Sequence, residues 1–298
     1  MVWQREGIAA ACVARTGAGK PLVRKAEWFG GSPDLALVEK AAREMGSGTH
    51  LVSTLLANGE YQLISVEAPN VPPEERKTAT RWRLKDILDY PVLEATVDVL
   101  DVPLDPNAVV RPQPSVFAIA ARNSVIQPRQ KLFEAAKVKL HAIDIPEMAQ
   151  RNVSALLEPE GRGLALLSFG TDGGLLTVTW RGELYLSRRM DVTLAQVRDE
   201  DPERRNAAFD KITLELQRSL DNFERQFSFI SVAKLVLAPG PAPSLEDYLS
   251  SNLYTRVETM ALDAVFDLAQ APELADPASQ QRFFLALGAA LRTGEGRA

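Results

Sequence analysis

Cysteine is almost missing from this sequence, since Cys12 is the only one among 298 residues. One cysteine cannot form a disulfide within the chain, and it cannot supply the several thiolates of a structural zinc site. Histidine is nearly as scarce, because only His50 and His141 are present and neither lies near other potential metal ligands at a suitable spacing. The sequence therefore predicts neither a disulfide framework nor a metal centre, and it is typical of a reducing compartment.

Long apolar runs are also missing. The longest weakly charged stretch, 163–180, contains Asp172, other polar residues and glycines, so we expect no helix that crosses a membrane. The apolar stretch 7–14 is short and follows Arg5 and Glu6, which makes it a poor signal peptide and a better buried strand. Lys and Arg are scattered and the net charge is −5, so the sequence offers no basic surface for nucleic acid.

The remaining composition is that of a folded globular protein, with 46% hydrophobic and 24% charged residues and enough length for two cores. Strand-like and helix-like apolar patterns alternate, which predicts an α/β architecture, and three successive strand patterns in 164–188 predict a meander. Strands are predicted at 7–15, 22–28, 49–56, 61–67, 95–102, 115–121, 141–145, 164–168, 175–180, 184–188, 232–238 and 256–260. Helices are predicted at 32–45, 74–88, 124–140, 146–154, 202–227, 244–251 and 278–292.

The pair Gly19-Lys20 invites comparison with a phosphate-binding P-loop. Ala14 stands where the first glycine of that motif belongs, and Pro21 replaces the hydroxyl residue that would hold magnesium. We interpret 16–21 as the turn of a hairpin, because its Gly and Pro residues supply turn geometry.

The segment 72–99 carries the most distinctive motif. Its helix pattern contains Trp82 and ends at Tyr90-Pro91, and a strand pattern with Asp98 follows. This segment resembles the helix-then-strand subdomain of the MshI and PilM proteins, which have an aromatic-containing helix, an aromatic-Pro pair and a strand carrying Asp. Further matches to that family span nearly the whole chain and lie at 168–174, 215–221, 233–238 and 284–292.

The resemblance implies an α/β fold of the actin-like, ribonuclease H-like kind, with two lobes and a small inserted subdomain. The first lobe would comprise 1–155, with the insert at about 65–105. The second lobe would comprise 156–272, and 273–298 would form a helix that returns to the first lobe.

The resemblance also implies a nucleotide site between the lobes, where two Asp-x-Gly loops hold phosphates and magnesium. The first strand and its loop are expected to be missing here, because no Asp-x-Gly precedes Gly7. Ser168 stands in the place of the second aspartate, and a supporting Gly-Gly turn has become 239–241. A plain glycine-rich turn is the alternative explanation of the residual phosphate loop, which would consist of Gly170, Thr171, Asp172 and Gly173.

The chemistry of that site is expected to be lost. Magnesium prefers carboxylate and water ligands in octahedral geometry, which a serine does not supply. Phosphoryl transfer depends on positioning and on charge neutralisation, so the resemblance implies a degenerate site without catalytic residues, metal or cofactor. Bound ATP with magnesium is the alternative.

Trp82 indicates a second contact surface on the helix pattern 74–88. Leu84, Ile87 and Leu88 share one stripe, whereas Trp82 falls on roughly the opposite side. The resemblance implies that the cytoplasmic tail of an inner-membrane, PilN-like partner docks between the main lobe and this subdomain. The residues expected to contact it are Trp82, Arg81, Arg83 and Lys85, while packing of Trp82 on its own sheet is the alternative.

These expectations describe a non-catalytic cytoplasmic scaffold, peripheral to the inner membrane, that takes part in MSHA-type IV pilus assembly with other components of the pilus machinery. One alternative is an actin-like ATPase whose site is rebuilt from Thr171, Asp172 and the turn 239–244. A second is the cytoplasmic domain of a GspL-like protein of type II secretion. Such a protein continues into a membrane helix, which the sequence lacks at 292–298.

Overall fold

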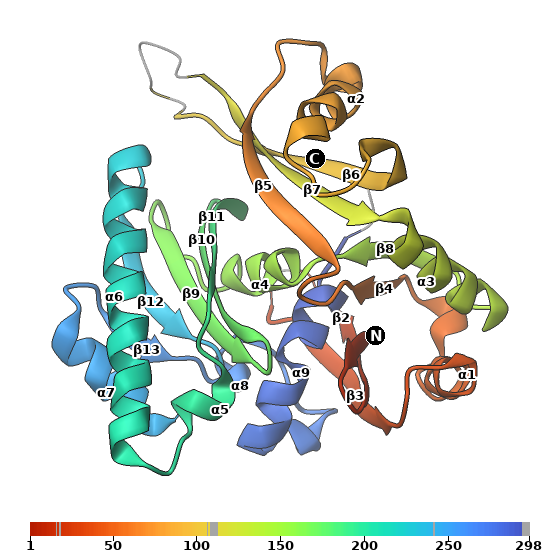
Figure 1. Cartoon of the computed structure of the whole chain (residues 1–298). Helices are drawn as coiled ribbons and strands as arrows, with labels where there is room; N and C mark the ends of the chain where they lie inside the picture. Colours follow the sequence, from red (N-terminus) through yellow and green to blue (C-terminus); the bar gives the residue numbers. More distant parts are fainter. Residues whose placement is uncertain (16, 18, 106, 108–112, 241, 294–298) are drawn as a thin grey trace.

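The computed structural model describes residues 1–15, 17, 19–105, 107, 113–240 and 242–293. Thr16 and Ala18 of the predicted turn, Pro241 and the end of the last predicted segment lie outside this description. The chain forms two lobes, and an additional small sheet lies across their upper side (Figure 1).

The second lobe is built on one mixed sheet with the strand order β11-β10-β9-β12-β13. Its first three strands form the predicted antiparallel meander, and β12 runs parallel to both β9 and β13. The strands are β9 (Gly163–Gly170), β10 (Gly173–Trp180), β11 (Glu183–Met190), β12 (Val232–Leu237) and β13 (Val257–Thr259). The helices are α5 (Leu194–Val197), α6 (Pro202–Gln226), α7 (Pro243–Asn252) and α8 (Leu262–Val265).

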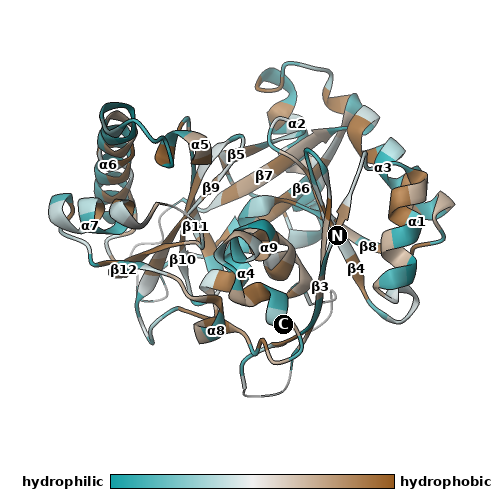
Figure 2. Cartoon of the chain, turned by 90° about the horizontal axis from the view of Figure 1, so that it is seen from below, coloured by the Kyte–Doolittle hydropathy of each residue, from teal (hydrophilic) through white to brown (hydrophobic). Residues whose placement is uncertain are grey.

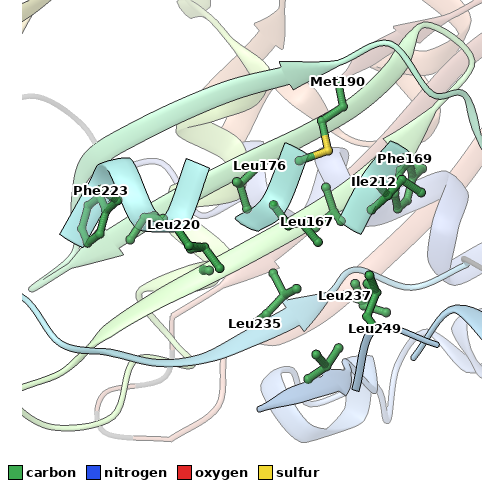
Figure 3. Close-up of a cluster of buried hydrophobic side chains, with 14 of the residues drawn as sticks. Leu167, Phe169, Leu176, Met190, Ile212, Leu220, Phe223, Leu235, Leu237 and Leu249 are labelled. Carbon is green, nitrogen blue, oxygen red and sulfur yellow. The ribbon is translucent and has the colours of Figure 1, made fainter. Parts of the chain in front are cut away.

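Strand β9 explains the continuous apolar run in the sequence, because it is covered on both faces. Ala165 and Leu167 pack in the cluster formed with α6, whereas Leu164 and Leu166 face the cluster on the other side of the sheet. The α6 side of this core is drawn in Figure 3, with leucine, isoleucine and phenylalanine side chains from the strands, α6 and α7 in one layer.

The first lobe repeats this strand order. Strands β1, β2 and β3 are antiparallel neighbours, and β4 and β8 form a parallel pair. The Met1 amino group donates to the Ser53 carbonyl oxygen (2.9 Å), and Arg129 links Trp3 to Leu55, so β1 lies beside β4 in the same direction. The elements are β1 (Val2–Gln4), β2 (Gly7–Ala14), β3 (Leu22–Gly30), α1 (Leu35–Glu44), β4 (Val52–Leu55), α3 (Asn123–Ala135), β8 (Leu140–Asp144) and α4 (Pro146–Ser154).

Three antiparallel strands followed by two parallel ones, repeated in two lobes, form the actin-like fold that the sequence predicted. The prediction that the first strand is missing is wrong. Strand β1 is present but has only three residues, too few to show an alternating pattern. The short helices α5 and α8, of four residues each, were not predicted for the same reason.

An additional antiparallel sheet of order β5-β7-β6 is inserted between β4 and α3. The segment that follows α2 covers one face of it through Leu84, Leu88 and Tyr90, while Val102 and Phe117 on its other side belong to the core of the second lobe. The insert therefore touches both lobes. Its elements are β5 (Tyr61–Glu67), α2 (Pro73–Arg83), β6 (Ala95–Val102) and β7 (Ser115–Arg122), and the predicted insert of about 65–105 lies within this segment.

Helix α9 (Pro277–Ala290) lies against β2 and against α4, and both helices lie between the two lobes (Figure 2). The Asn152 side chain donates to the Gly288 carbonyl oxygen (3.0 Å), and Gly288 packs directly on the Ala149 backbone. Short 3₁₀ turns complete the chain at Ser47–Thr49, Leu84–Asp86, Val92–Glu94 and Pro272–Ala275. Among the described residues, no helix combines the length and apolarity needed to cross a membrane.

Candidate functional site

The turn between β1 and β2 replaces the first expected phosphate loop. It consists of Arg5 and Glu6, both exposed, and the Glu6 carbonyl oxygen accepts a hydrogen bond from the Gly31 amide (2.9 Å). Gly7 closes the turn, because a Cβ atom there would collide with the Phe29 carbonyl oxygen. A hairpin turn this short does not offer the several free backbone amides that a phosphate-binding loop needs.

Ser168, which stands where the resemblance places an aspartate, belongs to a neutral buried network. Its hydroxyl donates to Gln150 Oε1 (2.7 Å). The Gln150 Nε2 donates to the Leu166 and Leu175 carbonyl oxygens (2.7 and 3.1 Å) and to the Thr177 hydroxyl (2.9 Å). Both polar atoms of the Gln150 side chain therefore have hydrogen-bond partners within the protein, as buried polar groups require.

The residual loop Gly170–Gly173 is a tight hairpin turn, since Gly170 and Gly173 pair directly across β9 and β10. Thr171 and Asp172 are exposed at its tip, and the Thr171 hydroxyl donates to Asp172 Oδ1 (3.2 Å). Asn58, from the turn between β4 and β5, donates to the Asp172 carbonyl oxygen (3.3 Å). This hydrogen bond joins the hairpin turn of the second lobe to the turn that follows β4 of the first lobe.

The turn at Pro239 and Gly240 is likewise occupied by side chains of the protein. Arg198 donates to the Gly240 carbonyl oxygen, and a Cβ atom at Gly240 would collide with the Gln281 side chain. Gly240 has a φ of +104°, a conformation that favours glycine.

The carboxylate at the end of β8 is paired within the chain. Asp144 Oδ2 forms an ion pair with Arg292, and Oδ1 accepts a hydrogen bond from the Ile145 amide (2.9 Å). Across the part of the chain that the structure describes, no group of three or more His, Cys, Asp or Glu side chains is placed to hold a metal ion.

Tyr61, Glu147 and Arg189 form a hydrogen-bonded triad where the insert, α4 and β11 meet. The Tyr61 hydroxyl donates to Glu147 Oε2 (2.5 Å), and Arg189 donates to the Tyr61 oxygen (2.5 Å) and to Glu147 Oε1 (3.0 Å). Burial and the Glu147 charge raise the pKa of Tyr61, so its hydroxyl stays protonated. Burial alone would lower the pKa of Arg189, but Glu147 and Tyr61 outweigh it and the pKa is raised.

The sequence predicted a role neither for Tyr61, Glu147 and Arg189 nor for Gln150. Tyr61 lies 86 residues from Glu147, and Arg189 lies 42 residues beyond it, so no local motif joins them. The one available signal is in α4, a short helix whose Glu147, Gln150 and Asn152 are all buried. Polar residues without an exposed face indicate internal hydrogen bonds.

The structure places the predicted partner-binding residues on and beyond α2. Trp82 is 56% exposed, whereas Arg81 donates to the Val92 and Leu93 carbonyl oxygens and so orders that segment. Arg83 donates to the Glu67 carbonyl oxygen (3.0 Å), and Lys85 is exposed.

Two further large apolar side chains near Trp82 are exposed, Ile87 by 50% and Leu93 by 69%. Ile87 was expected to share one stripe of a helix with Leu84 and Leu88, but those two are buried and Ile87 is not. Helix α2 ends at Arg83 and continues as a 3₁₀ turn, which shifts the phase of the residues that follow.

Ser168→Asp is expected to lower the free energy of unfolding by about 1–3 kcal/mol, because a carboxylate would face Gln150 Oε1 where a hydroxyl now donates. Urea denaturation with and without magnesium measures this. Ser250→Asp, at an exposed position of α7, is the matched control and should leave stability nearly unchanged. Stabilisation of Ser168→Asp by magnesium would show that one carboxylate rebuilds a metal site, which we do not expect.

Comparison with known proteins identifies the fold. No family model matches the sequence, and no curated protein sequence matches it significantly. Its structure is similar to that of a PilM–PilN type IV pilus biogenesis complex, with a TM-score of 0.74, 19% identity and coverage of 97% of this chain and 96% of the other. It is also similar to the cytoplasmic domain of EpsL, an inner-membrane component of the type II secretion system of Vibrio cholerae. That match has a TM-score of 0.50, 13% identity and 92% coverage of each chain.

Proposed function

We propose that this protein is a PilM-like, non-catalytic scaffold of type IV pilus assembly that binds the cytoplasmic tail of a PilN-like inner-membrane protein. The observation that carries the proposal is the similarity to a PilM–PilN complex over 97% of the chain, insert included. Within this class, the motif at 72–99 favours the MshI-like proteins of MSHA-type pili. The scaffold would act in the cytoplasm, held at the inner membrane by its partner.

The insert supports a peptide-binding role. Trp82, Ile87 and Leu93 are large apolar side chains that the fold leaves exposed, although Leu84, Leu88 and Tyr90 of the same segment are buried. Aromatic side chains with exposed rings are frequent anchors at interfaces. Arg81 fixes the Val92–Leu93 backbone beside α2, so this surface is ordered before a partner arrives, which reduces the entropy cost of binding.

Pairing of the polar and charged side chains within the protein supports the non-catalytic part of this proposal. Ser168 donates to Gln150, Asp144 is paired with Arg292, and Glu147 is paired with Arg189. Phosphoryl transfer needs free positive groups and a metal aimed at the phosphates. Here the charged side chains neutralise one another instead.

Titration with tail peptides tests the proposal. Synthetic cytoplasmic tails of inner-membrane pilus proteins are expected to bind the wild type, and Trp82→Ala should weaken binding about tenfold or more, since anchor residues contribute about 2 kcal/mol. Tyr254→Ala removes another exposed aromatic side chain, in the second lobe, and is the matched control. The proposal fails if no tail binds, or if both variants weaken binding equally.

Two further experiments distinguish the proposed function from an ATPase and from a type II secretion protein. Calorimetric titration with ATP and magnesium is expected to show no tight binding, and tight magnesium-dependent binding would favour the ATPase alternative. The similarity to EpsL favours a type II secretion role as the second candidate. A pull-down that captures type II secretion components but no pilus component would support it against our proposal.

A further inference from the structure

We propose that Tyr61, Glu147 and Arg189 form an internal latch that holds the two lobes together without a bound ligand. The inference rests on the geometry of the lobes and does not require the proposed partner. The hydrogen bonds of these three side chains run from the first lobe and the insert to the second lobe.

The latch joins three separate parts of the fold. Tyr61 is the first residue of β5 in the insert, Glu147 lies in the first turn of α4, and Arg189 lies in β11 of the second lobe. Each of the three side chains is hydrogen-bonded to the other two. No two of the three parts can separate without breaking one of these bonds.

Burial of the carboxylate strengthens the latch. The Glu147 side chain is only 2% exposed and Tyr61 belongs to an apolar cluster with Ile145 and Met148, whereas the Arg189 side chain is 36% exposed. A buried carboxylate that loses its cation is costly. Opening the lobes would separate Glu147 from Arg189.

Apolar and polar contacts around the triad act in the same direction. Val102 and Phe117 of the insert are buried in the second-lobe cluster, so opening would expose them to water. Asn58 adds a second bridge to the turn at Asp172. The inserted sheet is therefore coupled to the second lobe, and a pull on the insert would be transmitted through Tyr61 to Arg189.

Distance measurements between spin labels test the latch. Glu39 in α1 and Asp221 in α6 are exposed and suit labelling as cysteines in a Cys12→Ala background. The protein without ligand is expected to give one narrow distance distribution that ATP and magnesium leave unchanged. Arg189→Met should broaden it and speed amide exchange of β5 and β11 about tenfold or more.

Control variants separate the latch from general destabilisation. Arg188→Met changes the neighbouring residue of β11, which is exposed and lies 3.7 Å from Glu215, and should leave the distribution narrow. If Arg189→Met does not fold, Tyr61→Phe and the charge-balanced pair Glu147→Gln with Arg189→Met replace it, and both should broaden the distribution. The proposal is overturned if the latch variants keep the wild-type distribution, or if ATP and magnesium narrow that of the wild type.

Discussion

Gly288→Ala is expected to destabilise the whole protein by about 3 kcal/mol, even though alanine favours helices over glycine by about 1 kcal/mol. A Cβ atom at this position would collide with the Ala149 carbonyl oxygen, which belongs to the backbone of α4 and cannot rotate away. Helices α4 and α9 would have to move apart. The same movement would strain the bond from Asn152 to the Gly288 carbonyl oxygen.

Urea denaturation of the variant measures this loss. Gly48→Ala is the matched control, because a Cβ atom at Gly48 would meet no atom within 4 Å. It should change stability by less than about 0.5 kcal/mol, as surface substitutions usually do. A Gly288→Ala protein as stable as Gly48→Ala would show that the two helices are not held at this close approach.

The crossing of α4 and α9 matters because the interlobe contacts depend on it. Helix α4 carries Glu147 of the triad and Gln150 of the network at Ser168. Asn152 of the same helix is bonded to α9. A shift of α4 by a fraction of an ångström would disturb all three, so Gly288 supports the latch from a distance.

Much of the fold was predictable from local patterns. Strand β5 was predicted at its observed bounds, because the hairpin signal Asn58-Gly59 and clean alternation define it. Helix α4 was predicted at its observed bounds from its proline start. The short elements β1, α5 and α8 were not, since three or four residues carry no period.

The arrangement of the cleft was predictable only in part. The resemblance singled out Ser168 as the departure from an acidic position, but the hydrogen bond to Gln150 depends on how α4 crosses the second-lobe sheet. The triad of Tyr61, Glu147 and Arg189 depends on packing of the insert against both lobes. Contacts between residues so far apart in sequence follow from the fold, and a single sequence contains no local signal for them.

Charge pairing in the cleft gives one physical account of these departures. In an ATP-dependent relative, acidic groups hold a metal ion whose charge balances the phosphates. In this chain Asp144 is paired with Arg292, and Glu147 is paired with Arg189. A carboxylate already neutralised by an arginine has little to gain from magnesium.

Arg129→Met is expected to cost about 3–5 kcal/mol, the usual range when one partner of a buried ion pair is removed. Its side chain is 4% exposed, and its guanidinium binds Glu60 through two bonds (2.8 and 3.0 Å) and donates to the Leu55 carbonyl oxygen (2.7 Å). It also lies 4.1 Å from the centre of the Trp3 ring. Methionine keeps the aliphatic stem but removes the guanidinium that donates to the Leu55 oxygen and to Glu60, which keeps only its bond from the Ala57 amide.

Arg122 offers a matched control, because it also stacks on an aromatic ring (3.9 Å from the centre of Tyr90) and pairs with a carboxylate, that of Asp89. Its side chain is 43% exposed, so water screens the pair and Arg122→Met should cost about 1 kcal/mol or less. Chemical denaturation of both variants gives the comparison, and equal losses would refute the assigned role of burial. Since Glu60 anchors the turn that carries Asn58, Arg129→Met should also speed amide exchange at the turn 170–173, which Arg122→Met should leave unchanged.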